Sequence, residues 1–228
     1  MNPQPSYYDQ YQRRLYDASG FLYDLLARRF FMIFGGSVGR EFITDRGGFR
    51  AGQQVVSLGC GTGMQERSVA PRLLPGGGIV AVDTGPSQIA RAEKLNSYPH
   101  ARFFVGDARD TQLAAASFDR ALLCFALHEM PEDVRADVLA EARRLLKPDG
   151  KLVVAEHRIP DGKWMRRLQR VWWLNWLPGN TEKHTAGSLL RNTIPAELAT
   201  AGFCVSARHP FPGDSIMEVV VATKTAAT

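Results

Sequence analysis

The chain has 228 residues, of which 45% are hydrophobic and 22% charged, and its formal net charge is +5. This length can bury a sizeable core as one domain. The start carries no basic segment followed by a long apolar run, and the apolar run at 30–34 is far shorter than the roughly 20 residues of a membrane-spanning helix. We therefore expect a soluble, cytoplasmic protein. Cys60, Cys124 and Cys204 are widely spaced and form no CxxC pair, so we expect no disulfide framework and no metal site.

Aromatic residues recur at roughly helical spacings through residues 7–34, and Gly35-Gly36 follows them. The pattern predicts one or two helices that end at this glycine pair and cover the domain that follows. We take residues 1–48 as an N-terminal helical cap. Its aromatic side chains serve either as packing or as contacts to a ligand.

From residue 49 onward the chain predicts a Rossmann-like α/β domain. Strands are expected at 55–58, 79–83, 101–105, 118–125 and 152–156, with helices at 64–74, 87–96 and 132–146. Strands that alternate with helices of this length imply right-handed crossovers and a parallel, doubly wound sheet. A helical insert at 160–193, a helix at 195–201 and strands at 205–209 and 217–222 follow. The closing pair predicts one antiparallel strand.

The centre of the domain is the segment 55–65, in which a β-branched strand runs into glycines on alternate positions. Glycine has no Cβ and can adopt positive φ, so a ligand can approach its backbone closely. The dinucleotide fingerprint would need a third glycine at position 64, where this chain has Met64. Two carboxylates follow at strand ends: Asp83 can accept hydrogen bonds from ribose hydroxyls, and Asp107 from an adenine amino group.

These motifs resemble those of the class I S-adenosylmethionine-dependent methyltransferases, in particular the C-methyltransferases of ubiquinone and menaquinone synthesis. The resemblance rests on the glycine turn and on Tyr23-Asp24, 50–53, Asp83, 106–108, 117–119, 145–152 and 195–203. It implies the strand order 3-2-1-4-5-7-6, with strand 7 antiparallel. It also implies S-adenosylmethionine as the cofactor, with S-adenosylhomocysteine as product. The implied cofactor contacts are Tyr23, Ser57, Gly59, Cys60, Gly61, Thr62, Gly63, Met64, Asp83, Thr84, Asp107, Ala108 and Phe125.

One position departs from the family pattern. Where the family usually has Asp or Glu to help hold the cationic methionine end of the cofactor, this chain has Ser57. Serine supplies a hydrogen bond but no charge, and a lost charge-assisted contact is worth on the order of 1.5 to 3 kcal/mol.

The acceptor is expected opposite the cofactor, beyond the fourth and fifth strands. His128 is the best available base for a phenol or a carbon acid near neutral pH. In the alternative interpretation, His128 and Glu129 only satisfy backbone groups at a helix start. The predicted substrate contacts are Glu129, His157, Trp172 and Trp176.

The insert at 163–176 places tryptophans on one helical face and basic residues on the opposite face. Such a helix can lie on an anionic membrane, or it can pack as a roof over a substrate pocket. We expect no nucleic-acid partner, because aromatic stacking platforms normally lie on strands beside basic tracks. The sequence leaves the oligomeric state open.

Together these features predict methyl transfer from S-adenosylmethionine to a small lipophilic acceptor, such as a quinol, a phenol or a lipid-like molecule. Two alternatives stay open. One is a protein that binds the cofactor without methyltransferase activity, which the serine at position 57 would suit. The other is a related quinone-modifying enzyme, because the regions 119–123 and 127–129 are also similar to the rhodoquinone-forming branch.

Overall fold

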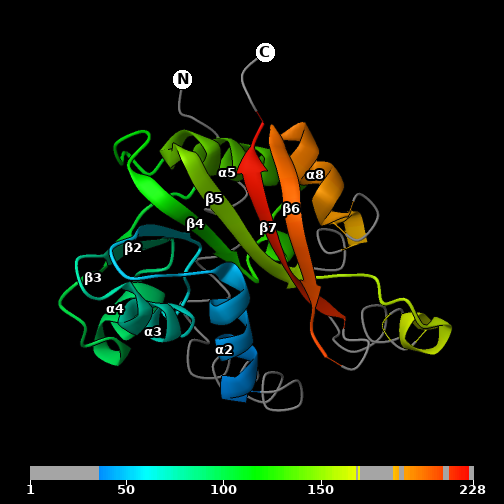
Figure 1. The fold of residues 1–228 in the computed structure, drawn as a ribbon, viewed down its shortest axis with the longest axis horizontal. Helices are drawn as coiled ribbons and strands as arrows, with labels where there is room; N and C mark the ends of the chain where they lie inside the picture. The colour runs from blue at the N-terminus through cyan, green and yellow to red at the C-terminus, as the bar shows by residue number, and fades with distance from the viewer. Residues whose placement is uncertain (1–35, 168, 170–186, 190–192, 213–215, 226–228) are drawn as a thin grey trace.

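The computed structural model of the chain describes residues 36–167, 169, 187–189, 193–212 and 216–225. A seven-stranded sheet in the order β3-β2-β1-β4-β5-β7-β6 forms its centre (Figure 1). This confirms the predicted order. The strands are β1 (Gln54–Leu58), β2 (Gly78–Asp83), β3 (Ala101–Val105), β4 (Phe118–Cys124), β5 (Leu146–His157), β6 (Phe203–Pro210) and β7 (Met217–Lys224).

Strand β1 lies in the middle of the parallel part of the sheet. It pairs in parallel with β2 on one side and with β4 on the other, and β4 pairs in parallel with β5. Strand β7 is antiparallel to both β5 and β6, as predicted. The carboxyl ends of β1 to β5 therefore lie along one edge, which is where open α/β sheets bind their ligands.

Helices cover both faces of the sheet, as a doubly wound fold requires. They are α2 (Gly36–Gly47), α3 (Glu66–Val69), η1 (Ala70–Leu73), α4 (Pro86–Leu95), η2 (Leu127–Glu129), α5 (Glu132–Leu145) and α8 (Ile194–Thr200). On one face Val56 and Leu58 of β1 pack in a buried cluster with side chains of α5 and α8. On the other face Val55 packs with side chains of α2, α3 and η1. The alternation along β1 thus sends Ser57 to the same face as α2 and α3.

The predicted helix at 64–74 is wrong in its extent. Only Glu66–Val69 is α-helical, and the chain continues as a 3₁₀ helix, Ala70–Leu73. Pro71 explains the difference, because it has no backbone N–H to donate to the preceding turn. Glu66 therefore begins a very short helix directly after the glycine turn.

One further boundary differs from the prediction. Strand β5 begins at Leu146, which pairs with Phe118, and a register shift follows before Arg120 pairs with Lys151. The segment between the predicted helix at 132–146 and the predicted strand at 152–156 is therefore an irregular part of the strand. Helix α2 is the first element of the described chain, and the predicted helical segment that ends at Gly35-Gly36 lies outside the described residues.

Much of the predicted cap and insert lies outside the described residues. Helix α2 falls within the predicted cap, and residues 163–167 and 187–189 of the insert are helical. Among the helices that the structure describes, none has the length and apolar character needed to cross a membrane.

Candidate functional site

The glycine turn after β1 adopts the backbone conformation that its sequence predicts. Gly59, Gly61 and Gly63 have φ angles of +73°, +53° and +71°. A Cβ on Gly63 would lie 2.7 Å from Asn96 Nδ2, so close packing requires glycine there. A Cβ on Gly61 would meet nothing within 4 Å. Packing therefore explains Gly63, whereas the space beside Gly61 is open to a ligand.

Asp83, the last residue of β2, holds this turn in place. Its Oδ2 accepts a hydrogen bond of 2.8 Å from the Gly61 backbone N–H, and its Oδ1 accepts one of 2.9 Å from Gly85. Desolvation raises the pKa of Asp83, against these backbone hydrogen bonds. The carboxyl group thus lies directly beside the open backbone of Gly61, and Thr84 follows it at the same strand end.

Asp107 lies after β3 and is engaged by Arg109. The Nε of Arg109 lies 3.0 Å from Oδ1 and 2.9 Å from Oδ2 of Asp107, and the Arg109 backbone N–H donates to Oδ1 at 2.9 Å. Burial alone would raise the pKa of Asp107, but the hydrogen bonds and charge of Arg109 outweigh it and lower the pKa. The carboxylate is therefore ionised and held in a fixed orientation, and Ala108 beside it is buried.

Ser57 has a partner that the sequence analysis missed. Its Oγ donates a hydrogen bond of 2.6 Å to Oε1 of Glu66, and both residues are only 1% exposed. The other carboxyl oxygen, Oε2, has no hydrogen-bond partner among the described residues. Burial raises the pKa of Glu66 to about 7, against the hydrogen bond from Ser57. A buried carboxyl group therefore lies directly beside position 57, and it comes from α3 rather than from β1.

Hydrogen bonds also connect helix α2 to the segment that follows the glycine turn. Gln65, which precedes Glu66, donates from Nε2 to the Thr44 hydroxyl at 3.0 Å and to the Arg40 carbonyl at 3.2 Å. Two adjacent residues after the glycine turn thus face α2 and β1 respectively. The described part of the predicted cap is therefore tied to the turn by side-chain hydrogen bonds.

A second group of polar side chains lies at the ends of β4 and β5. His128 on η2 approaches Glu156 with an Nδ1 to Oε1 distance of 2.9 Å, and its backbone N–H donates to Oε2 at 3.3 Å. The backbone N–H of His157 donates to Glu156 Oε1 at 2.8 Å. The rings of His128 and His157 meet edge to face, with centroids 4.9 Å apart. We call His128, Glu156 and His157 the His–Glu–His cluster.

The charges of this cluster are unequal. Burial lowers the pKa of His157 to about 4, helped by the charge of His128. Burial alone would raise the pKa of Glu156, but the charge and hydrogen bond of His128 outweigh it and lower the pKa. The cluster thus contains an ionised carboxyl group beside two imidazoles, with all three residues buried. Its donor atoms lie within 4.8 Å of one another, so the cluster could hold a metal ion.

The cluster and the glycine turn are neighbours. A Cβ on Gly59 would lie 3.1 Å from the Cβ of Ala126, just ahead of η2. Phe125 precedes Ala126 with a φ of +52°, and its ring meets the edge of His157 with centroids 5.6 Å apart. A positive φ on a bulky residue is a strained conformation of the kind that gathers at functional sites.

The structure brings most of the predicted site residues to this edge of the sheet. Those around the turn and the ends of β2 and β3 are Ser57, Gly59, Cys60, Gly61, Thr62, Gly63, Met64, Asp83, Thr84, Asp107 and Ala108. Those at the ends of β4 and β5 are Phe125, His128, Glu129 and His157. Tyr23, Trp172 and Trp176 lie outside the described residues. The roles assigned to all these residues stay predictions.

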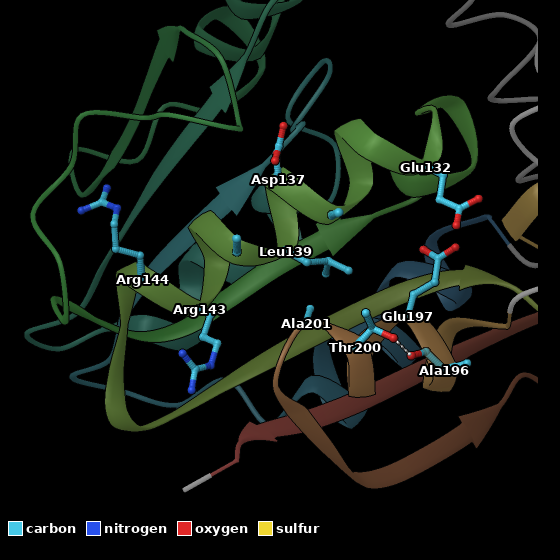
Figure 2. A pocket seen from close by; sticks show the side chains of 11 residues that line it. Glu132, Asp137, Leu139, Arg143, Arg144, Ala196, Glu197, Thr200 and Ala201 are labelled. Carbon is cyan, nitrogen blue, oxygen red and sulfur yellow. Dashed lines mark hydrogen bonds between the residues drawn. The ribbon is translucent and has the colours of Figure 1, made fainter. Parts of the chain in front are cut away.

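A separate groove of about 930 Å³ lies between α5 and α8. Figure 2 shows Arg143 and Arg144 at one end of it and Glu132 and Glu197 at the other. None of its lining residues belongs to the glycine turn or to the His–Glu–His cluster. The groove is therefore distinct from the site at the strand ends.

Comparisons with known proteins find relatives in sequence and in fold. Residues 55–150, which span the glycine turn and β5's irregular start, match the family model described as a methyltransferase domain. An uncharacterized methyltransferase of Synechocystis is 30% identical over 173 residues, with 74% of each chain covered. The demethylmenaquinone methyltransferase of Symbiobacterium thermophilum is 26% identical over 181 residues, covering 77% of this chain and 70% of its own.

A solved structure shares the fold. The TehB-like S-adenosylmethionine-dependent methyltransferase of Corynebacterium glutamicum superposes with a TM-score of 0.59 at 22% identity, and the match covers 92% of this chain and 100% of the other.

Proposed function

Because the chain belongs to the class I S-adenosylmethionine-dependent methyltransferases, we propose that it transfers a methyl group from S-adenosylmethionine to a small lipophilic acceptor carrying a hydroxyl group, such as a quinol or a phenol. The single observation that carries the proposal is the open backbone of Gly61, held by Asp83 beside a buried carboxyl group with an unpartnered oxygen.

The residues at the strand ends fit the cofactor. Asp83 would accept from the ribose hydroxyls, and Asp107 with Ala108 would face the adenine. The glycine turn would pass beneath the methionine end, because the side-chain position of Gly61 is open. When bound, S-adenosylmethionine supplies an electrophilic methyl group on a sulfonium centre.

Glu66 offers the negative charge that Ser57 lacks. Its unpartnered Oε2 is buried, so an approaching ammonium group would give it the partner that it lacks. With a pKa of about 7, Glu66 is only partly ionised near neutral pH, and a cation beside it would favour ionisation. Glu66 would thus bind the methionine ammonium, with Ser57 fixing the orientation of the carboxyl group.

The His–Glu–His cluster would lie on the acceptor side. Methyl transfer requires an aligned nucleophile, and a phenol or quinol becomes a much stronger nucleophile when its hydroxyl gives up its proton. The contact between His128 Nδ1 and Glu156 Oε1 favours the tautomer with the proton on Nδ1, which makes Nε2 the basic nitrogen. We assign removal of the acceptor proton to this cluster, with His128 as its basic side chain and Glu129 and His157 as acceptor contacts.

The lipophilic acceptor draws support from the insert and from the relatives. Trp164 is 74% exposed beside the exposed Lys163, Arg166 and Arg167, an arrangement that suits an anionic membrane surface. The demethylmenaquinone methyltransferase of Symbiobacterium thermophilum, by its name, acts on demethylmenaquinone.

The test follows release of S-adenosylhomocysteine when the full chain is given S-adenosylmethionine and a reduced short-chain quinone. We expect turnover by the wild type, a loss of at least about 100-fold in His128→Ala, and an unchanged rate in His209→Ala. His209 lies on the edge strand β6, and β7 separates it from β5 and the cluster. If the chain binds S-adenosylmethionine but releases no S-adenosylhomocysteine with any quinol or phenol, the proposed transfer is refuted. The chain would then be a cofactor-binding protein.

A further inference from the structure

The His–Glu–His cluster has the chemistry of a metal site, which the sequence analysis did not foresee. His128 and Glu156 are 28 positions apart in the sequence, and the pairing of β4 with β5 brings them together. We propose that His128, Glu156 and His157 together bind one divalent transition-metal ion, which coordinates an ionised hydroxyl group of the methyl acceptor.

The distances suit a single ion. Zinc binds imidazole nitrogen and carboxylate oxygen at roughly 2.0 to 2.2 Å, which places neighbouring ligand atoms roughly 3 to 3.5 Å apart. Glu156 Oε1 lies 2.9 Å from His128 Nδ1 and 4.0 Å from His157 Nε2, and all three ligand atoms fit within 4.8 Å. An ion bound here would replace the proton that His128 Nδ1 shares with Glu156 in the unloaded site, and the His157 ring would have to move toward Glu156.

Neighbouring groups hold the three proposed ligand side chains in position. Backbone N–H groups of His128 and His157 both donate to the Glu156 carboxylate, so its orientation is fixed before any ion arrives. Metal sites rely on such outer hydrogen bonds to orient their ligands. All three residues are buried, and Phe125 packs against the edge of His157. Two imidazoles and one carboxylate are the ligand set of several zinc and non-haem iron sites that keep positions open for substrate.

The net charge of the ion and its three ligands indicates which class of acceptor would bind. An ion of charge +2, one carboxylate and two neutral imidazoles leave one net positive charge in a buried place. An acceptor oxygen that has lost its proton would neutralise it, and the ion would lower the pKa of that hydroxyl. The hydroxyl O–H bond breaks, the oxygen binds the ion and the proton leaves to solvent. The acceptor would therefore be a phenol, hydroquinone or enol, and His128 would act as a ligand in the loaded site.

The acceptor part of this inference rests on the proposed function, whereas metal binding itself does not. The experiment uses the full chain without a histidine tag, stripped with a chelator and then titrated calorimetrically with Zn²⁺ alone. Co²⁺ is added in a parallel titration, because its visible absorption reports nitrogen and oxygen coordination. We expect one ion per chain, and at least a 100-fold loss of Zn²⁺ affinity in Glu156→Gln and in His157→Gln. His209→Gln should bind as the wild type does.

Two variants guard against a folding defect. If Glu156→Gln does not fold, His157→Gln provides the same comparison, and far-ultraviolet circular dichroism checks both. The absence of saturable Zn²⁺ and Co²⁺ binding by the wild type would overturn the proposal, as would full affinity in a folded ligand variant. The proposed function fails in a different way, through the absence of S-adenosylmethionine binding. A chain that transfers methyl groups equally well with and without chelator would retain the function and lose the metal site.

Discussion

Replacing Glu66 should change the stability of the fold and the affinity for the cofactor in opposite directions. Replacing it by Gln keeps a carbonyl oxygen that can accept from the Ser57 hydroxyl, but it removes the group that ionises. We expect Glu66→Gln to be more stable than the wild type in alkaline solution and to bind S-adenosylmethionine less tightly. If the contact between Ser57 and Glu66 served only the fold, Glu66→Gln would not combine higher stability in alkali with weaker cofactor binding.

The magnitude follows from the pKa. Burial raises the pKa of Glu66 from 4.5 to about 7, so the folded chain favours its protonated form. The stability that this preference contributes is fully present below the unfolded pKa and is lost as the pH rises from there through about 7. A pKa shift of this size lowers the free energy of unfolding by about 3 kcal/mol above neutral pH. Burial also keeps the thiols of Cys60 and Cys124 neutral over this range, since it raises their pKa well above the ordinary value. Desolvation raises the pKa of Asp83 as well. Because the wild type and Glu66→Gln both contain Asp83, its titration does not contribute to the difference between them.

Urea unfolding of the cofactor-free wild type and of Glu66→Gln between about pH 4 and pH 8 measures this difference. The two free energies of unfolding should converge in acid and differ by up to about 3 kcal/mol in alkali, with the variant the more stable. Calorimetry should show the variant binding S-adenosylmethionine roughly 10- to 150-fold more weakly, because a hydrogen bond to a charged group is lost.

Ser57→Asp in the Glu66→Gln background provides the matched control. It returns the charge at the position that the resembling family uses, so we expect cofactor affinity to recover. A pH-independent difference in stability between wild type and Glu66→Gln, or unchanged cofactor affinity in the single variant, would refute the reasoning.

The remaining predictions concern the turn and its support. Gly61→Ala and Gly52→Ala introduce the same kind of strain, of about 1 kcal/mol, because both glycines have positive φ and open space around the side-chain position. Only Gly61→Ala should lose S-adenosylmethionine affinity by calorimetry, and an equal loss in both would contradict the placement of the cofactor. Asp83→Asn keeps an acceptor for only one of the Gly61 and Gly85 N–H groups, so the free energy of unfolding should fall by roughly 1 to 3 kcal/mol while cofactor affinity falls at least about 10-fold; retained affinity would mean that the ribose lies elsewhere. Arg135 is fully buried and pairs with Glu197 at 2.6 Å, so Arg135→Leu should lower the free energy of unfolding by roughly 3 to 5 kcal/mol. A loss below about 1 kcal/mol would contradict that role.

The fold could be predicted because its signals are local. The β-branched strand at 55–58, the glycine turn and Asp83 stand in a short segment with a characteristic spacing, and they carried the resemblance from which the strand order followed. The error in the predicted helix at 64–74 was also local, because Pro71 shortened a helix whose apolar pattern continued past it.

The contacts between side chains of different elements could not be predicted in the same way. Ser57 and Glu66 meet because β1 and α3 turn back on each other around the glycines, and the one clue in the sequence is an acidic residue where the short helix begins. His128 and Glu156 meet because β4 and β5 pair in a particular register. Such contacts depend on strand register and on burial, which a single sequence does not display.

The central claim is that the open turn beside Asp83 and Glu66 binds S-adenosylmethionine. Isothermal titration calorimetry of the full wild-type chain tests it most directly, with S-adenosylhomocysteine as a competitor. We expect saturable heat with one cofactor bound per chain, and displacement by the demethylated product. No heat of binding with S-adenosylmethionine at about 1 mM, which corresponds to a binding free energy weaker than about −4 kcal/mol, would contradict it.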